Sequence, residues 1–412
     1  MHTRRVLLAG IAAFVCGVGC AGIVSSRDSG ASHNDAAAGA DASTGDSEAS
    51  DDDGTPGADA STGDSEASDD DATPGADAST GDSEASDDGG PTLDGVVPKD
   101  AGVTQNAGSD AGAGPCDRTM TQPVALATAL GGLGLAVAGD WVYFGNPSSA
   151  GVSRVPKAGG PVEVPAAGDA SLMLASSLPS RLALDADYVY WPALSAGVAR
   201  VAIAGFSQAT PSVVLPTTTG HVDGDLRGLA VDATHAYLTT TATTIYAGAK
   251  GGGSLTPFAT TTGSAWVIAA DPTGVYWADS SLGIYKAAAD GGAPNLLQSG
   301  NTWGLALDDT SVYATSNDGR ILKVSKSGTP SATLVTLGAE RPFAIAVDDQ
   351  SVYWSDTTQS EGGLPVGTLR KVSKTGGAVT LIATTSTQVY DLAVDGTCVY
   401  YVDTGGVMRV SK

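Results

Sequence analysis

The chain has 412 residues and a formal net charge of −24 at neutral pH. Its 45 acidic residues outnumber the 21 lysines and arginines, and no basic cluster is visible that could neutralise a phosphate backbone. We therefore expect no nucleic-acid partner.

The first residues, 1–20, have the pattern of an export signal. Arg4 and Arg5 precede an apolar stretch over residues 6–18, which is too short to span a bilayer comfortably. The run Gly17-Val18-Gly19-Cys20 resembles a bacterial lipobox, and this resemblance implies that Cys20 becomes a lipidated first residue. Simple cleavage near Ala21 is the alternative.

Two further resemblances concern the export route and cellular location of the protein. Residues 3–8 resemble a twin-arginine signal. Ala21 after the cysteine resembles the sorting pattern of outer-membrane lipoproteins. We expect an exported lipoprotein of the outer membrane or cell surface, whose only membrane attachment is the lipid; a periplasmic or secreted protein is the alternative.

Residues 21–115 have the composition of a tether. An 18-residue Asp-, Ser- and Gly-rich unit begins at Gly39, Gly57 and Gly75, and residues 25–115 hold 22 acidic and 2 basic residues, a net charge of −20. With no apolar period the segment cannot bury surface to offset its chain entropy, so we expect a disordered, extended spacer. A calcium loop is the alternative, but Ala49 breaks its spacing before Asp51 and Asp53. We expect no metal and no cofactor.

The rest of the chain, 116–412, is built from repeats. A tyrosine follows the start of a short apolar segment by eight residues, and it does so seven times. The tyrosines are Tyr143, Tyr190, Tyr237, Tyr276, Tyr313, Tyr353 and Tyr400. The segment starts are 47, 47, 39, 37, 40 and 47 residues apart, and a period near forty built from strand-like pieces indicates a propeller or similar array.

Each repeat contains the signals of four antiparallel strands. An apolar segment ends in Asp, a short turn leads to Val-Tyr-Trp or a variant, a third strand carries a basic residue, and a Gly-rich turn precedes a fourth apolar strand. Four such strands form one blade, and radial repetition leaves only short sheet edges. We predict an all-β domain over residues 116–412, a seven-bladed β-propeller.

The first and last parts of this domain complement each other. The seventh repeat begins at Leu392 and ends after its third strand, whereas residues 123–128 have the pattern of the fourth strand at 378–383. We expect the N-terminal segment to pair in the last blade and close the ring. Cys116 and Cys398 would then lie at the same end of that blade, so we predict a disulfide between them in an exported chain. Two unpaired thiols are the alternative.

Two repeats carry a family resemblance. The segments at 271–292 (DPTGVYWADSSLGIYKAAADGG) and 348–356 (DDQSVYWSD) resemble the YWTD repeat of low-density-lipoprotein-receptor-type propellers. That family usually has six blades, whereas seven repeats are present here. The TolB-like and NHL-like propellers fit the pattern equally well.

One face of the propeller is predicted to carry the site. The turn between the first and second strands has the same length in every repeat, whereas insertions at 166–180, 217–225 and 357–367 fall on the opposite face. Loops on a rigid scaffold are where binding residues concentrate. On this face, we expect the residues two positions before each inner strand, together with adjacent arginines, to form a rim around the central channel. Its candidate ligand-binding residues are Arg181, Arg227, Trp266, Trp303, Arg341, Phe343 and Tyr390.

These aromatic and arginine side chains suit a protein, peptide, glycan or flat organic ligand through stacking and cation–π contact. The alternative is that they only plug the channel and pack between blades. Trp191, Trp277, Trp354 and the repeat tyrosines are interpreted as blade core, and the Asp residues that end the inner strands as turn caps.

Catalytic chemistry has little support in the sequence. The domain has two histidines, His221 in an inserted loop and His235 in the uniform turn, and they are not expected to meet. No spacing suggests zinc. We expect a binding or interaction module and no catalytic residue; an enzyme of the lactonase or lyase type and a purely structural surface protein are the alternatives.

Overall fold

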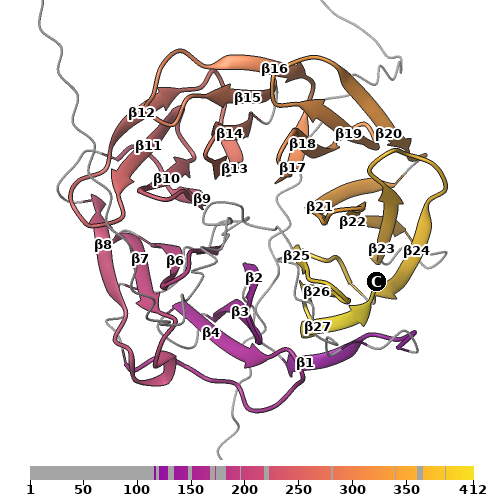
Figure 1. The fold of residues 1–412 in the computed structure, drawn as a ribbon, viewed down its shortest axis with the longest axis horizontal. Coiled ribbons are helices and arrows are strands. Elements are labelled where there is room, and N and C mark those ends of the chain that lie inside the picture. Colours follow the sequence, from indigo (N-terminus) through magenta and orange to yellow (C-terminus); the bar gives the residue numbers. More distant parts are fainter. Residues whose placement is uncertain are drawn as a thin grey trace, which may run out of the picture. The chain divides into compact units, whose positions relative to one another are not determined.

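The computed structural model describes Cys116, Leu172 and residues 120–128, 134–146, 151–167, 182–194, 196–217, 222–279, 282–338, 340–359, 365–385 and 387–412. The export signal with Cys20, the tether, Arg181 and His221 lie outside these residues. The described residues form seven antiparallel sheets arranged radially, as predicted, in a seven-bladed propeller (Figure 1).

The first three blades contain the following strands. Blade 1 consists of β2 (Leu135–Ala138), β3 (Trp141–Asn146) and β4 (Gly151–Pro156). Blade 2 consists of β5 (Ala183–Leu184), β6 (Tyr188–Ala193), β7 (Gly197–Ala202) and β8 (Ser212–Pro216), with the 3-10 turn η2 (Phe206–Gln208) before β8. Blade 3 consists of β9 (Leu226–Val231), β10 (His235–Thr240), β11 (Thr244–Ala249) and β12 (Thr256–Thr260).

The other four blades complete the ring. Blade 4 consists of β13 (Ala265–Asp271), β14 (Gly274–Asp279), β15 (Gly283–Ala287) and β16 (Asn295–Ser299). Blade 5 consists of β17 (Thr302–Leu307), β18 (Ser311–Ser316), β19 (Arg320–Ser325) and β20 (Ser331–Thr336). Blade 6 consists of β21 (Arg341–Val347), β22 (Ser351–Gln359), β23 (Pro365–Ser373) and β24 (Thr380–Thr385). Blade 7 consists of β25 (Asp391–Val394), β26 (Cys398–Asp403), β27 (Gly406–Ser411) and the N-terminal β1 (Val124–Thr128).

Blade 1 departs from the four-stranded pattern. Its fourth strand is reduced, in the described residues, to one isolated bridge between Arg154 and Glu163. Pro161 and Pro165 flank that bridge, and proline has no N–H to donate to a ladder. The apolar residues of this segment, Val162 and Val164, are exposed instead of paired.

The core lies between the blades. All seven repeat tyrosines are buried, at 3% exposure or less, and Trp191, Trp277 and Trp354 are fully buried, which confirms their interpretation as core. Three hydrophobic clusters each join the tyrosine of one blade to the tryptophan of the next: Tyr143 to Trp191, Tyr237 to Trp277, and Tyr313 to Trp354. Each such aromatic buries enough apolar area to stabilise the fold by about 1.5–3 kcal/mol.

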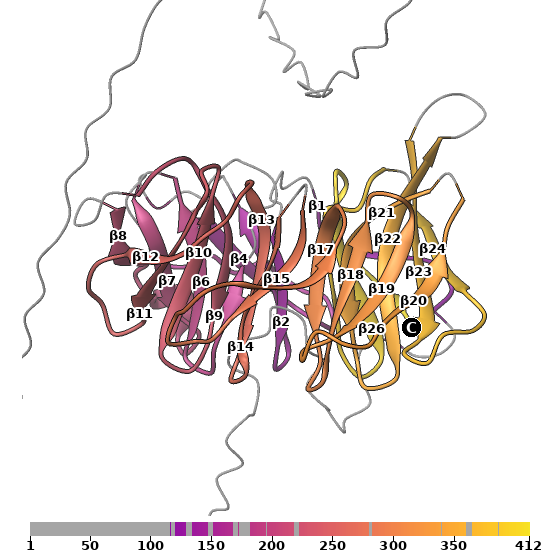
Figure 2. The same cartoon turned by 90° about the horizontal axis from the view of Figure 1, so that it is seen from above.

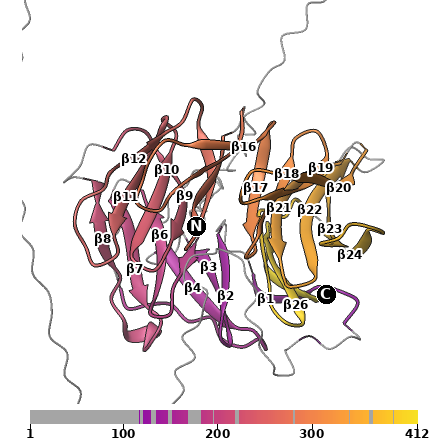
Figure 3. The same ribbon diagram turned by 45° about the horizontal axis from the view of Figure 1, so that its top comes forward.

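The first strands of the blades lie innermost, around the axis of the ring (Figure 1), and Figure 3 shows β2, β9, β17 and β21 of this set in a tilted view. These inner strands are β2, β5, β9, β13, β17, β21 and β25. We call the face where they begin the rim face and the face where they end the turn face. The long strands β22 and β23, nine residues each, extend beyond their neighbours on the rim face (Figure 2).

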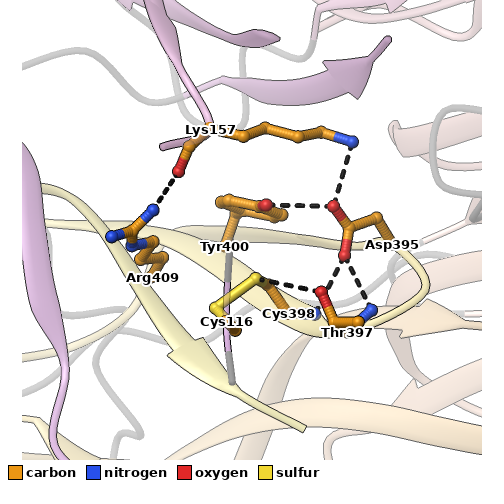
Figure 4. The surroundings of a disulfide bond; sticks show 7 residues. All are labelled: Cys116, Lys157, Asp395, Thr397, Cys398, Tyr400 and Arg409. Atoms are coloured by element: carbon orange, nitrogen blue, oxygen red, sulfur yellow. Dashed lines mark hydrogen bonds and ion pairs between the residues drawn. A yellow bond between two sulfur atoms is a disulfide. The ribbon is translucent and has the colours of Figure 1, made fainter. Parts of the chain in front are cut away.

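Ring closure follows the prediction. β1 pairs with β27 from Val124↔Arg409 to Thr128↔Gly406, so the N-terminal strand completes the last blade. Cys116 and Cys398 form a disulfide with their Cα atoms 5.5 Å apart (Figure 4). Beside it, Lys157 of blade 1 forms an ion pair with Asp395 of blade 7, at 2.9 Å, and Arg409 donates a hydrogen bond to the Lys157 carbonyl.

On the turn face, an Asp at the end of the inner strand caps the turn in blades 2 to 7, as predicted. Asp308 is representative: its Oδ1 accepts hydrogen bonds from the backbone N–H groups of Thr310 and Ser311, at 2.9 and 2.8 Å. Its Oδ2 also accepts from the Tyr313 hydroxyl and pairs with Lys374 of the next blade. The sequence interpretation included the cap but missed this ion pair across the blade seam.

Candidate functional site: an aromatic row on the rim face

Four consecutive inner strands share a bulge near their first residues. In β13, Ala265 and Val267 pair with consecutive residues of β14, so Trp266 between them has no partner on that strand. In β17, Thr302 and Gly304 pair with consecutive residues of β18, and Trp303 is skipped in the same way. β9 and β21 skip the segments that contain Arg227 and Phe343 in the same way. A β-bulge re-aims the side chain of the extra residue, so the four skipped side chains leave the regular alternation together.

Hydroxyl groups on the second strands satisfy the backbone at these bulges. The Gly228 N–H donates to Thr239 Oγ1 at 2.8 Å, the Ala344 N–H donates to Ser355 Oγ at 3.1 Å, and Thr315 Oγ1 donates to the Phe343 carbonyl at 2.8 Å. Because these polar groups are paired, the bulges are stable features of the fold rather than frayed strand ends.

The skipped side chains form a continuous row across blades 3–6. The Arg227 guanidinium carbon lies 3.9 Å from the centroid of the Trp266 ring. The Trp266 and Trp303 rings meet edge to face at 5.5 Å, and the Trp303 and Phe343 rings lie 6.0 Å apart at 41°. All four side chains are half-buried. We call this set, Arg227–Trp266–Trp303–Phe343, the aromatic row.

Three polar atoms of the aromatic row are buried without a hydrogen-bond partner among the described residues. Arg227 Nε and Nη1 and Trp266 Nε1 are buried, and none has a hydrogen-bond partner in the part of the chain that the structure describes. Burial lowers the pKa of Arg227, and the carboxylate of Asp225 opposes that shift. The side chain stays charged at neutral pH because a guanidinium does not lose its proton in proteins. Leaving such donors unpaired costs about 1–3 kcal/mol.

The other stacked arginines have partners. Arg154 lies 3.9 Å from the Trp141 ring centroid, but its Nε donates to Glu163 Oε2 at 2.9 Å and its Nη1 donates to the Ile203 carbonyl at 3.1 Å. Arg200 stacks on Tyr188 and donates to the Lys250 carbonyl. Stacking on an aromatic ring therefore does not by itself leave an arginine unpaired here, and Arg227 differs in having two buried nitrogen atoms without a hydrogen-bond partner among the described residues.

The structure brings together four of the seven residues proposed from sequence. Arg341 is exposed at the start of β21 and makes none of the row's ring contacts. Tyr390 packs against the core of the closing blade. Arg181 lies outside the described residues. The row residues stand inside their strands rather than two residues before them, because the bulges let each strand continue past the skipped side chain.

Sequence reasoning missed a set of buried acids on the rim face. Asp279 and Asp403 end the second strands of their blades, Asp356 has the same place in the repeat within the longer strand β22, and all three are buried. The signal was the final Asp of YWAD, YWSD and YYVD. Burial raises the pKa of Asp356, although Thr368 and Arg370 counteract the shift. Trp354 Nε1 donates to its Oδ2 at 3.1 Å, so this carboxyl ties the blade core to the rim face.

The described residues contain no group of three or more His, Cys, Asp or Glu side chains placed to hold a metal ion. None of their helices is long and apolar enough to cross a membrane. His235 lies on the turn face at the start of β10, away from the aromatic row.

No protein-family model and no curated protein matches the chain. Among solved structures it is similar to a computationally designed protein, Ika8, with a TM-score of 0.51 and 14% identity over 71% of this chain and 99% of that one. Two others are a nidogen/laminin complex (TM-score 0.41, 18% identity, 52% and 85% covered) and YCF48 from Cyanidioschyzon merolae (TM-score 0.40, 14% identity, 54% and 78% covered). At 14% identity the likeness to Ika8 supports the fold alone.

Proposed function

We propose that the chain is an exported binding module whose rim face binds a ligand at the aromatic row. The observation that carries this proposal is the Arg227 guanidinium, which stacks on Trp266 at the end of a row of three aromatic rings and whose buried Nε and Nη1 have no hydrogen-bond partner among the described residues. The ligand it fits has a carboxylate or carbonyl acceptor for Arg227 and a flat apolar face for Trp303 and Phe343. Acidic glycans and peptides with a free carboxylate both have this chemistry.

Channel packing is the competing explanation, and the charges in the row weigh against it. A plug made only for packing gains nothing from a desolvated cation, since replacing it by an apolar side chain of similar volume would remove the cost of its unpaired N–H groups. A ligand acceptor would recover that cost on binding.

The binding test compares variants of the full chain on panels of acidic and neutral glycans and of peptides with free or amidated C-termini. Arg227→Met keeps the side-chain stem and removes the donors, and it should weaken binding of carboxylate ligands about tenfold or more while leaving uncharged analogues unaffected. Trp303→Ala should weaken both classes.

Trp141→Ala is the matched control, because Trp141 is also half-buried under an arginine but lies at the opposite end of its blade. Unchanged binding in this variant, with unchanged thermal midpoints in all three, supports the site. Equal losses in the Trp141 and Trp303 variants, or no carboxylate ligand on either panel, would refute it. Release of a cleaved product would favour the lactonase- or lyase-type alternative.

We also propose that the module is attached to the envelope by a lipid on Cys20, with residues 21–115 as its spacer. The lipobox-like run and the acidic repeats motivate this, and the Cys116–Cys398 disulfide is consistent with an oxidising compartment. In a bacterial host, Cys20→Ala should move the chain from the membrane fraction to the soluble fraction. Retention in the membrane fraction would contradict lipid anchoring.

A further inference from the structure

A lysine bridges five of the seven blade seams. In each of these blades, one residue of the third strand pairs with the blade tyrosine, and the lysine stands three residues after it. Its ammonium pairs with the Asp that ends the inner strand of the preceding blade. The pairs are Lys157–Asp395, Lys250–Asp185, Lys326–Asp271, Lys374–Asp308 and Lys412–Asp348. Each ammonium also lies 5.2–6.0 Å from the ring centroid of the blade tyrosine beside that Asp. Figure 4 shows this arrangement for Lys157, Tyr400 and Asp395.

The seam between blades 1 and 2 has neither the Asp nor the lysine of this pair. Ala138 stands where the other blades have Asp, and Ile203 stands where they have lysine. No charge is therefore left without a counter-charge at that position.

The seam between blades 3 and 4 has the Asp but not the lysine. Asp232 is retained and 7% exposed, whereas Ala289 stands at the lysine position. Asp232 Oδ1 accepts from the N–H groups of Thr234 and His235, both at 2.7 Å, and Oδ2 accepts from the Tyr237 hydroxyl at 2.7 Å. No ammonium or guanidinium in the described chain reaches this carboxylate, although a buried carboxylate is ordinarily paired.

A cavity lies at this same seam on the turn face. It has a volume of about 330 Å³ and is bounded by strands β10, β11 and β12 of blade 3 and by the turn from Ala289 to Gly291 of blade 4. Two of its lining residues touch the surroundings of the carboxylate. The His235 N–H donates to Asp232, and the Ala289 carbonyl accepts at 3.2 Å from the same Tyr237 hydroxyl that donates to Asp232.

The charges around the cavity favour a cation. Asp290 lines the cavity and is exposed. Burial raises the pKa of Tyr237, and the charges of Asp232 and Asp290 raise it further, so both carboxylates act at this tyrosine. The nearest lysines in the repeat pattern are occupied: Lys250 pairs with Asp185, and Lys286 donates to the Lys326 carbonyl.

We propose that this cavity binds a primary alkylammonium group, which takes the place over Tyr237 and beside Asp232 that a lysine side chain fills at the other five seams. A lysine on a partner protein and a free alkyl amine or diamine share this chemistry. A metal ion fits less well, because the described residues here offer no cluster of three acidic or histidine ligands. This site is on the face opposite to the aromatic row and does not depend on it.

The test uses the full chain with n-butylammonium, which reproduces the lysine side chain, and n-butanol as its uncharged analogue. Saturable binding of n-butylammonium, a rise of the thermal midpoint by about 2 °C or more at saturation, and no response to n-butanol are expected. Asp232→Asn keeps acceptors for the turn and should weaken amine binding roughly tenfold or more. Every variant retains the acidic segment 25–115, so differences between variants isolate the cavity.

The repeat pattern offers a matched pair of substitutions. Ala289→Lys restores the missing lysine and should raise the thermal midpoint without ligand and abolish the response to n-butylammonium. Ile203→Lys places the same side chain opposite Ala138, where no carboxylate receives it, and should give no such rise. A lysine peptide that binds more tightly than cadaverine identifies a protein partner, and the reverse order identifies a free diamine. No saturable binding, or an equal response in wild type and in both the Asp232 and Ala289 variants, overturns the proposal.

Discussion

Removing the Cys116–Cys398 disulfide should be the largest single loss of stability available at the ring seam. The bond closes a segment of 282 residues, so reduction restores the freedom of nearly the whole propeller in the unfolded state. In the chain-entropy model a loop of this length contributes about 5.6 kcal/mol at 25 °C. That is a large part of the roughly 5–15 kcal/mol by which a folded domain exceeds its unfolded state.

The assay is urea unfolding followed by tryptophan fluorescence, with and without reductant. With a denaturant slope of about 3 kcal/mol per molar, a loss of about 5.6 kcal/mol moves the midpoint down by about 1.9 M urea. The slope itself should rise, since an uncrosslinked unfolded chain exposes more surface. Cys116→Ala/Cys398→Ala should reproduce the reduced protein and should not respond to reductant.

The same measurement decides what holds the seam. β1 also contributes Leu126 and Ala127, both buried, and the Lys157–Asp395 ion pair spans the same junction. If reduction leaves the midpoint unchanged, strand pairing and packing alone hold the ring closed, and the entropic reasoning is wrong. If amide exchange in β1 becomes fast only after reduction, the crosslink is what keeps this strand in the last blade.

Two further predictions concern the blade seams. Burial alone raises the pKa of Asp308, but hydrogen bonds from Lys374, Thr310 and Tyr313 lower it to about 2. This carboxyl therefore contributes stability that is complete above about pH 4 and is lost as the pH falls toward 2. Lys374→Gln should remove about 1–2 kcal/mol at neutral pH and flatten this acid-side loss in urea titrations; equal slopes in both proteins would contradict it. Separately, a Cβ at Gly304 would lie 2.5 Å from the Phe343 carbonyl oxygen, so Gly304→Ala should lower the free energy of unfolding by about 1–3 kcal/mol. Gly251→Ala is the control, because a Cβ there would meet nothing within 4 Å. Equal unfolding midpoints for the two variants would show that the inner strands can separate freely.

The sequence alone determined the organisation of the propeller. The repeat tyrosines predicted the buried core, because a residue at a fixed place in every blade meets the same neighbours each time, and all seven are buried. The incomplete last repeat and the strand-like segment before the first predicted the closing strand, and the two cysteines followed from it. These features depend on local strand patterns and on the number of repeats, which the chain carries in order.

Contacts between blades were decided only by the tertiary structure. Lys250 and Asp185 are 65 residues apart, and Lys157 and Asp395 meet only because the ring closes, so the periodic pattern within a blade says nothing about their pairing. The aromatic row depends likewise on bulges that turn Trp266 and Trp303 out of strand alternation. Its ends were not foreseen: the row begins at Arg227 and stops at Phe343, while Tyr390 joins the core of the last blade. A strand sequence fixes which residues alternate, but which side chains meet across a seam depends on backbone irregularities and on the neighbouring blade, and these exist only once the sheets have packed.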